Sequence, residues 1–321
     1  MDFGYPQFLA ADTLKLYILE GGIKKQKADV SNEPGNVTIQ ATGKQAWRRE
    51  GIKYRKNEVF LDVIERVNLV MSAKGTVLSQ DVSGVVQMKC FLSGMPECRL
   101  GLNDKLLMDN EDRNNEKPRG RQPSEKIELD DVVFHQCVRL GSFENDRSVS
   151  FVPPDGDFEL MRYRVTGEQI HLPFRLIPVV NELGRTRLEV QVSLKSLFDA
   201  RFFGTNVVCK IPAPPNTAAT TITVSVGKAK YEPEEGFIVW RIRRFPGDVE
   251  HKFSAEISLS SSTSDKKAWS RPPIELAFQV PMYTASSLEV RYLRVIETKT
   301  NMQAVKWVRY VTRAGTYTHR I

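Results

Sequence analysis

Two residue pairs, one near each end of the chain, have side chains that could bind a phenol ring. Phe60 and Asp62 are two positions apart near the start, and Trp307 and Arg309 are two positions apart near the end. Successive side chains of a strand point to opposite faces, so each pair shares one face if the two runs are strands. Side by side, the strands would form an aromatic slot that ends in a carboxylate and a guanidinium. Such a slot fits a flat apolar ring with a polar tip, which is the chemistry of tyrosine.

The spacing alone also fits an ordinary protein interior. In that interpretation Phe60 and Trp307 are core side chains, because large aromatic residues on strands are usually buried. Asp62 and Arg309 are then an ion pair with no further role. The residues by themselves leave both interpretations open.

The sequence lacks the motifs of common catalytic and metal centres. It has no glycine-rich phosphate loop, no His-Glu-x-x-His, no Cys-x-x-Cys and no serine in a nucleophile-elbow pattern. Its four histidines are far apart, and His135, beside a strand pattern, is expected to be structural. We therefore expect a binding protein rather than an enzyme, with no cofactor and no metal ion.

Composition and charge narrow the choice of partners without deciding it. The chain has 321 residues, 41% hydrophobic and 26% charged, which is ordinary for a globular protein. No run approaches the roughly 20 apolar residues of a membrane-spanning helix, and the start has no signal-peptide pattern. Four scattered cysteines do not predict a disulfide framework, so we expect reduced thiols. A net charge of +7 favours anionic partners: nucleic acid, acidic peptides or anionic lipid.

Strands must position the slot, and alternating patterns dominate from residue 59 onward. Many strands at short intervals, with proline and glycine between them, predict an all-β fold built from sandwiches. The expected strands are 59–69, 82–92, 127–134, 148–152, 158–165, 188–192, 207–211, 221–226, 237–242, 253–259, 274–280, 288–296 and 305–310.

Three segments depart from this pattern. Residues 10–22 predict a short helix that Asp12 caps. Residues 23–43 are polar and predict a linker, and residues 109–126 predict a surface loop.

The chain resembles the C-terminal part of a clathrin-adaptor medium (mu) subunit. The motifs that carry the resemblance occur in order along the chain: Asp2–Gln7, Trp47–Tyr54, Asn57–Asp62, Leu92–Glu97, Phe134–Leu140, Phe151–Gly156, Arg271–Pro273 and Lys306–Tyr310. Within the family, the plasma-membrane endocytic complex is the most similar, through Leu172–Arg175, Glu182–Thr186 and Gly227–Tyr231. Such subunits also carry an N-terminal longin-like domain, so we expect this chain to be a fragment of a longer subunit.

The resemblance implies an elongated mu homology domain of two β-sandwich subdomains. Residues 45–168 plus 283–321 would form subdomain A, which binds the cargo signal, and residues 169–282 would form an inserted subdomain B. Residues 1–44 would be the linker with its short helix. This arrangement would bring the two ends of the chain together at the slot.

The resemblance also implies what the slot binds: sorting signals of the form tyrosine-x-x-bulky hydrophobic in the cytoplasmic tails of membrane cargo. The tyrosine pocket would consist of Phe60, Asp62, Lys89, Trp307 and Arg309. The hydrophobic pocket would consist of Val59, Leu61, Val290, Leu293 and Val308. A peptide added to a sheet edge presents these two anchors to opposite faces. Leu61 and Val308 fit that parity. Val290 and Leu293 are three apart and cannot share a face in a regular strand, so either a bulge or approach from a strand end is needed there.

Further sites follow from the same resemblance. Two lysine and arginine clusters would bind phosphatidylinositol bisphosphate at the membrane: Lys53, Arg55, Lys56 and Lys306 in one, Lys228 and Lys230 in the other. Val226 stands where the endocytic subunit can carry another lysine. Thr42 would be the phosphorylated linker threonine. The implied partners are the other subunits of a heterotetrameric adaptor, and the implied location is cytoplasmic, on the plasma membrane at clathrin-coated pits.

Three alternatives stay open at this point. The chain could be the medium subunit of the trans-Golgi and endosomal adaptor, or an adaptor that binds cargo with another face. A nucleic-acid-binding β-protein is the rival from another class, suggested by the basic pI of about 9.1 and by the run Trp240–Phe245.

Overall fold

The structure is a computed structural model that describes residues 47–103, 127–139, 149–167, 169–184, 186–260, 269–297 and 303–321. Every regular element in these ranges is a β-strand, which confirms the predicted all-β fold. The predicted helix at 10–22, the linker at 23–43 and the loop at 109–126 lie outside the described residues.

The described part contains sixteen strands. They are β1 (Glu58–Met71), β2 (Val77–Phe91), β3 (Glu97–Leu102), β4 (Asp131–Phe134), β5 (Val149–Phe151), β6 (Gly156–Thr166), β7 (Phe174–Glu182), β8 (Arg187–Ser196), β9 (Phe203–Pro212), β10 (Thr217–Val224), β11 (Lys228–Glu232), β12 (Phe237–Pro246), β13 (Glu250–Leu259), β14 (Ile274–Pro281), β15 (Val290–Ile296) and β16 (Val305–His319). The alternating patterns had predicted thirteen of them; β3, β7 and β11 were missed. Two of the missed strands, β7 and β11, are sheet edges.

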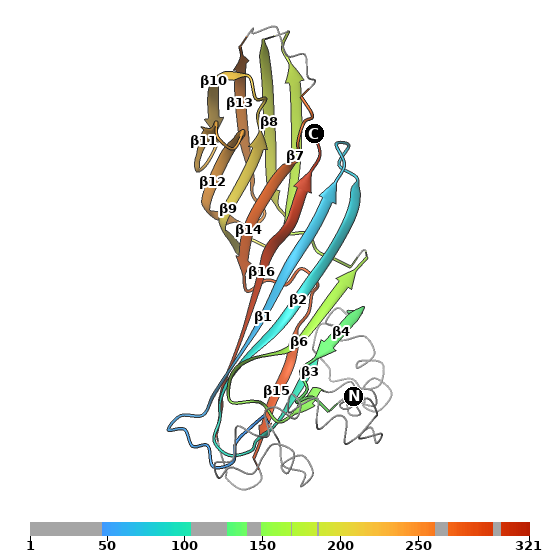
Figure 1. Cartoon of the computed structure of the whole chain (residues 1–321), viewed down its shortest axis with the longest axis vertical. Helices are drawn as coiled ribbons and strands as arrows, with labels where there is room; N and C mark the ends of the chain where they lie inside the picture. Colours follow the sequence, from blue (N-terminus) through green and yellow to red (C-terminus); the bar gives the residue numbers. More distant parts are fainter. Residues whose placement is uncertain are drawn as a thin grey trace, which may run out of the picture.

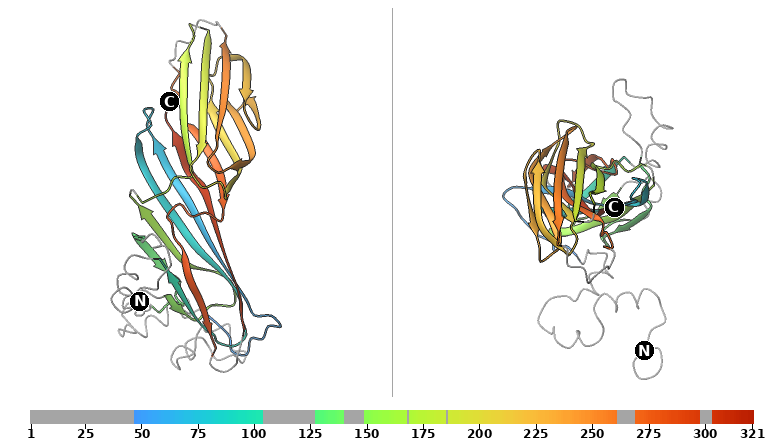
Figure 2. Two further views of the ribbon diagram at one scale, coloured as in Figure 1. Left: turned by 180° about the vertical axis from the view of Figure 1, so that it is seen from behind. Right: turned by 90° about the horizontal axis from the view of Figure 1, so that it is seen from above.

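One nine-stranded sheet runs the length of the elongated molecule (Figure 1). Its order is β11-β12-β9-β14-β16-β1-β2-β6-β4. A four-stranded sheet, β10-β13-β8-β7, lies at one end, and a three-stranded sheet, β15-β3-β5, lies at the other (Figure 2). The strands from the two chain ends therefore meet in the middle of the largest sheet.

The predicted subdomain boundaries fall between strands. Residues 168 and 169 lie between β6 and β7, and residues 282 and 283 lie between β14 and β15. The nine-stranded sheet is continuous across both boundaries. The division into subdomains A and B therefore stays a prediction.

Alternation along β1 separates the core from the surface. Val59, Leu61 and Val63 are fully buried, whereas the residues between them, Phe60 and Asp62, are only partly covered. The hydrophobic effect fixes this register, because a shift by one residue would expose the apolar set. The face opposite the core is called the outward face below.

A buried carboxylate holds β1 to its surroundings in the core. Glu65 is fully buried and accepts hydrogen bonds from the Tyr163 hydroxyl at 2.8 Å, from the Ala285 and Ser286 amides at 2.6 and 3.3 Å, and from the Ser286 hydroxyl. Burial raises the pKa of Glu65, and these hydrogen bonds oppose that rise only in part. The contacts connect β1 to β6 and to the segment that leads into β15.

A buried arginine fastens the segment before β1. The Arg48 guanidinium donates to the carbonyl oxygens of Gly94 at 2.9 Å, of Pro153 at 3.1 Å and of Leu92. The Trp47 indole donates to the Val152 carbonyl at 2.8 Å. Arg48 is only 3% exposed, so hydrogen bonds to these carbonyl oxygens replace water in stabilising its buried charge.

Candidate functional site

The two predicted halves of the slot lie on neighbouring strands. β1 and β16 pair in parallel, with Phe60 opposite Trp307 and Asp62 opposite Arg309. Directly paired residues of a sheet share a face, so all four side chains lie on the outward face. Trp307 is 55% exposed. This exposure excludes the interpretation of Trp307 as a core residue and leaves its ring available to a partner.

The polar end of the slot is an ion pair with two hydrogen bonds. Arg309 Nε donates to Asp62 Oδ1 at 2.7 Å, and its terminal nitrogen donates to Asp62 Oδ2 at 2.6 Å. The hydrogen bond and the charge of Asp62 raise the pKa of Arg309. Bidentate geometry of this kind fixes the orientation of both groups. The slot therefore presents a pre-organised carboxylate and guanidinium beside two aromatic rings.

Lys89 lies beside Phe60 on the neighbouring strand. It is directly opposite Phe60 on β2, and its ammonium donates to Asp157 Oδ2 on β6 at 2.8 Å. Asp157 was missed by the sequence reasoning. Its place follows from the antiparallel register of β2 and β6, in which Lys89 is opposite Asp157, and a single sequence does not reveal that register.

One edge of β16 is open beside the slot. β14 pairs with β16 from Val311 onward, and the Met282 amide donates to the Tyr310 carbonyl at 2.7 Å. Residues 305–309, which come before this point in β16, pair with β1 on one side. No described strand pairs with their other side. Unpaired strand edges accept an added strand.

The predicted hydrophobic pocket is on the core side of the same strands. Leu61 is opposite Val308, and the Val290 amide donates to the Tyr310 hydroxyl at 3.0 Å, so the start of β15 lies against β16. Val59 and Leu61 are fully buried and can contribute only a floor, and Leu293 is 7% exposed. Val290 and Val308 keep accessible surface.

Of the two expected solutions for Val290 and Leu293, the structure contains the bulge. The register of β15 against β3 shifts between Val290 and Tyr292. As a result Val290 is opposite Leu102 and Leu293 is opposite Leu100. Leu100 and Leu102 are two apart and share a face, so Val290 and Leu293 share one too.

Comparison with known proteins gives the family. A profile of the adaptor complexes medium subunit family matches residues 45–321. The chain belongs to this family. That result confirms the resemblance seen in the sequence, and the family is a non-enzymatic trafficking family.

Individual relatives agree with this membership. The chain is 56% identical to the AP-2 complex subunit mu of Dictyostelium discoideum and 46% identical to that of Caenorhabditis elegans. Each alignment spans 327 residues, all of this chain and 74% of the relative. Its fold is similar to that of the Fcho1 mu homology domain from Danio rerio, solved with a bound Eps15 peptide. The TM-score is 0.54 at 10% identity, over 86% of this chain and 99% of that domain. This last comparison supports the mu homology fold.

The first basic cluster of the medium subunit lies beside the slot. Lys53, Arg55 and Lys56 are exposed in the loop before β1, and Lys306 is exposed at the start of β16. The Val305 amide donates to the Asn57 carbonyl at 2.9 Å, which joins this loop to β16. The structure thus places these four cations at the same end of the β1–β16 pair.

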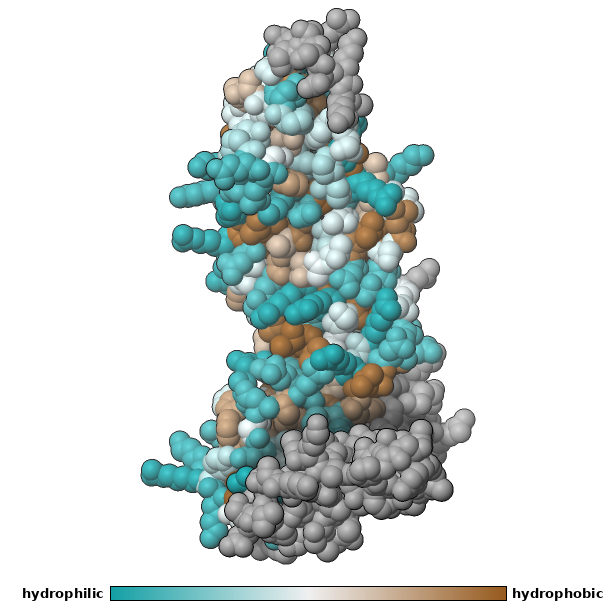
Figure 3. Space-filling view, in the orientation of Figure 1, coloured by the Kyte–Doolittle hydropathy of each residue, from teal (hydrophilic) through white to brown (hydrophobic). Residues whose placement is uncertain are grey.

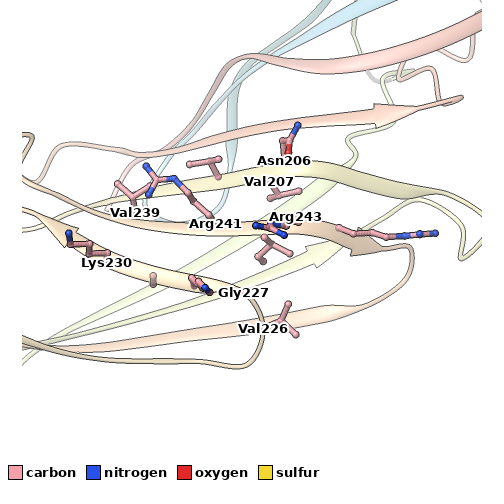
Figure 4. A pocket seen from close by; sticks show the side chains of 13 residues that line it. Asn206, Val207, Val226, Gly227, Lys230, Val239, Arg241 and Arg243 are labelled. Atoms are coloured by element: carbon pink, nitrogen blue, oxygen red, sulfur yellow. The ribbon is translucent and has the colours of Figure 1, made fainter.

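The second basic cluster lines a groove at the other end of the molecule. Lys228 and Lys230 are exposed on the edge strand β11. This groove has a volume of about 930 Å³ and lies between β11, β12 and β9 (Figure 4). Arg241, Arg243 and Arg244 add to its charge. From the sequence alone, these arginines support only the nucleic-acid alternative.

The predictions about phosphorylation and metal binding, and the question of a membrane-spanning helix, concern other parts of the chain. Thr42 lies outside the described residues. The described ranges hold no group of three or more histidine, cysteine or acidic side chains that could bind a metal ion. In those ranges no helix is long and apolar enough to cross a membrane.

Proposed function

We propose that this chain is the cargo-recognition domain of a clathrin adaptor of the AP-2 type, and that it selects membrane proteins for endocytosis. Its family membership and its identity to two AP-2 mu subunits over its whole length support this assignment. They do not favour the trans-Golgi adaptor or a nucleic-acid-binding protein. The domain acts by binding rather than by catalysis.

The cargo tail binds as an added strand along the open edge of β16. Its tyrosine enters the slot on the outward face, with the ring between Phe60 and Trp307. Asp62, Arg309 and Lys89 hydrogen-bond the phenol hydroxyl. The observation that carries this mechanism is that the exposed Trp307 and the Asp62–Arg309 pair lie on one face beside an unpaired strand edge.

The second anchor binds on the opposite face. In an extended peptide, the residue three positions after the tyrosine points away from the tyrosine side. That residue reaches the pocket of Val308, Val290 and Leu293, over the floor that Val59 and Leu61 contribute. Two anchors must offset the ordering of a loose tail, so we expect an affinity of about micromolar, roughly −8 kcal/mol.

The basic clusters bring the domain to the membrane. Lys53, Arg55, Lys56 and Lys306 form one phosphatidylinositol bisphosphate site, and Lys228 and Lys230 form another. Exposed cations near an anionic leaflet each contribute about 1 kcal/mol. The domain then works at the cytoplasmic face of the plasma membrane, in clathrin-coated pits, with the other subunits of its adaptor complex. Phosphorylation of Thr42 would regulate its placement there.

An undirected peptide-display selection on the purified chain tests the assignment of cargo. Enrichment of tyrosine-x-x-hydrophobic sequences is the expected result. Enrichment of unrelated sequences, equally by the wild type and by Trp307→Ala, would show that cargo binds elsewhere. Binding to oligonucleotides that competes with peptide would favour the nucleic-acid alternative.

A further inference from the structure

Two arginines that have no acidic partner among the described residues lie side by side on the outward face. Arg66 on β1 is directly opposite Arg313 on β16. Both are exposed, and neither makes an ion pair or a hydrogen bond through its side chain with any other residue in the described ranges. Paired residues on neighbouring strands are about 4.8 Å apart, and like charges directly opposite each other destabilise a sheet.

The neighbours of this pair do not neutralise it. Ser83 on β2 is next to Arg66, and Gln279 on β14 is next to Arg313. The diagonal acid is Asp81, but its carboxylate accepts from Asn68 Nδ2 at 3.0 Å and lies 3.5 Å from Arg164 Nε. The two guanidinium groups therefore form an uncompensated positive site.

The site is continuous with the tyrosine slot. Arg66 and Arg313 follow Asp62 and Arg309 by four positions on the same two strands, in the same register and on the same face. Four residues of a strand span about 13 Å. A peptide segment of about four extended residues covers the same distance.

The edge of β16 directs a bound tail toward this pair. β14 occupies that edge from Val311 onward, and Pro281 opposite Val311 offers no amide hydrogen. A tail that lies along residues 305–309 and continues in this direction has to leave the edge at Val311. The outward face then offers it a path over Ile64 and Val311 to the two arginines.

We propose that Arg66 and Arg313 bind an acidic side chain of the same cargo tail that places its tyrosine in the slot. This inference rests on the proposed function and adds a third determinant to the signal. A carboxylate matches two adjacent guanidinium groups in charge and can accept hydrogen bonds from both. The other occupant that fits the charge is the anionic membrane, which the experiment below distinguishes.

A glutamate scan by calorimetry tests the inference. The probe is a synthetic peptide with a central tyrosine-x-x-leucine and a neutral flank; single glutamates are placed in turn at each position from six before the tyrosine to seven after it. We expect one or two adjacent positions, on one side of the signal only, to tighten binding about three- to tenfold at low salt. The gain falls as salt rises, because the site is exposed to solvent.

Two double variants test whether Arg66 and Arg313 cause the gain in affinity from glutamate. In Arg66→Gln with Arg313→Gln, the neutral peptide binds as in the wild type and the gain from glutamate is lost. Arg175→Gln with Arg187→Gln removes the same charge from the four-stranded sheet and keeps the gain. A gain that survives in the first variant, or a wild type without any favoured position, overturns the inference.

Two further outcomes are separated by the same experiment. If the wild type does not bind the neutral peptide, the proposed function fails and this inference fails with it. If the peptides bind the Arg66 and Arg313 variant as they bind the wild type, while the variant loses binding to vesicles of phosphatidylcholine with phosphatidylserine, the pair belongs to the membrane and the inference is overturned.

Discussion

Asp62 and Arg309 are joined by two hydrogen bonds although 247 positions separate them in the chain. The parallel pairing of β1 with β16 makes this contact, and the same register puts Phe60 beside Trp307. β1 and β16 pair only when both ends of the chain are folded. Unfolding of the domain should therefore abolish the slot, and the slot should not open separately.

Removal of single slot residues tests the binding role. We expect Asp62→Ala and Trp307→Ala each to weaken a tyrosine-x-x-leucine peptide by about 2 kcal/mol or more, since one loses the phenol acceptor and the other a ring face. Trp307 is exposed, and the partner that Asp62→Ala leaves unpaired, Arg309, has a side chain that is 61% exposed. The thermal unfolding midpoint should therefore change little. Calorimetry and circular dichroism measure the two effects, and unchanged affinity in both variants would show the slot to be wrongly assigned.

The phenol hydroxyl should determine which aromatic side chain the slot binds most tightly. Replacement of the peptide tyrosine by phenylalanine leaves the polar end of the slot without its partner and should cost about 1–3 kcal/mol. Phosphotyrosine should bind more weakly still, because its negative charge faces Asp62 where space is short. Competition of the three peptides against one fluorescent tyrosine peptide gives the order, and a phenylalanine peptide that binds equally well contradicts this mechanism.

Asp157 should control how strongly the slot rejects negative charge. Asp157→Asn frees Lys89 from its ion pair while the size of the side chain is kept. We expect the ratio of tyrosine to phosphotyrosine affinity to fall several-fold, because an unpaired ammonium then faces the phosphate. Glu159→Gln is the matched control, since its partner is Arg162 and not a slot residue. The same ratio in both variants would exclude Asp157 from the slot.

Glu65 should make the fold sensitive to pH. Burial raises the pKa of this carboxyl group, so its contribution to stability is complete below about pH 4.5 and is lost as pH rises toward the folded-state pKa. Relative to Glu65→Gln, the wild type should therefore lose free energy of unfolding as pH rises above that value. Urea unfolding at several pH values measures the difference.

A second substitution separates charge from hydrogen bonding at the same position. Glu65→Ala should cost about 3 kcal/mol, because the Tyr163 hydroxyl and the Ala285 amide lose their acceptor. A difference between wild type and Glu65→Gln that is constant with pH would contradict the assignment.

The lipid role has its own test. Alanine at Lys53, Arg55 and Lys56 together should reduce flotation with vesicles that contain phosphatidylinositol bisphosphate, and more so at low salt. Peptide affinity in solution should stay the same. Equal flotation of variant and wild type at both salt concentrations would remove this cluster from the membrane site.

The sequence predicted most strands because their alternation is strong. Buried positions of β1 alternate with partly covered ones, and in β16 Val308, Tyr310 and Thr312 are more covered than Trp307, Arg309 and Arg313. The motifs of these two strands also carry the family resemblance. β11 is a short and lysine-rich edge strand, and β7 contains Pro178, which is tolerated because β7 is an edge. Both features weaken the strand signal in a single sequence.

The site was predictable in part. The resemblance supplied the slot residues, and strand parity suggested a bulge or approach from a strand end at Val290 and Leu293. The structure contains a register shift there. The role of Asp157 and the Arg66–Arg313 pair could not be predicted, because both depend on cross-strand register. The hydrophobic pattern of one strand fixes which face each side chain takes, but it does not show which residue of a distant strand lies opposite.

A crystal structure of the chain with a bound tyrosine-x-x-leucine peptide tests the central claim most directly. We predict that the peptide forms a strand beside residues 305–309, with its phenol ring between Phe60 and Trp307 and its hydroxyl within hydrogen-bond distance of Asp62 and Arg309. A peptide bound on another face, with the slot empty, would contradict the account.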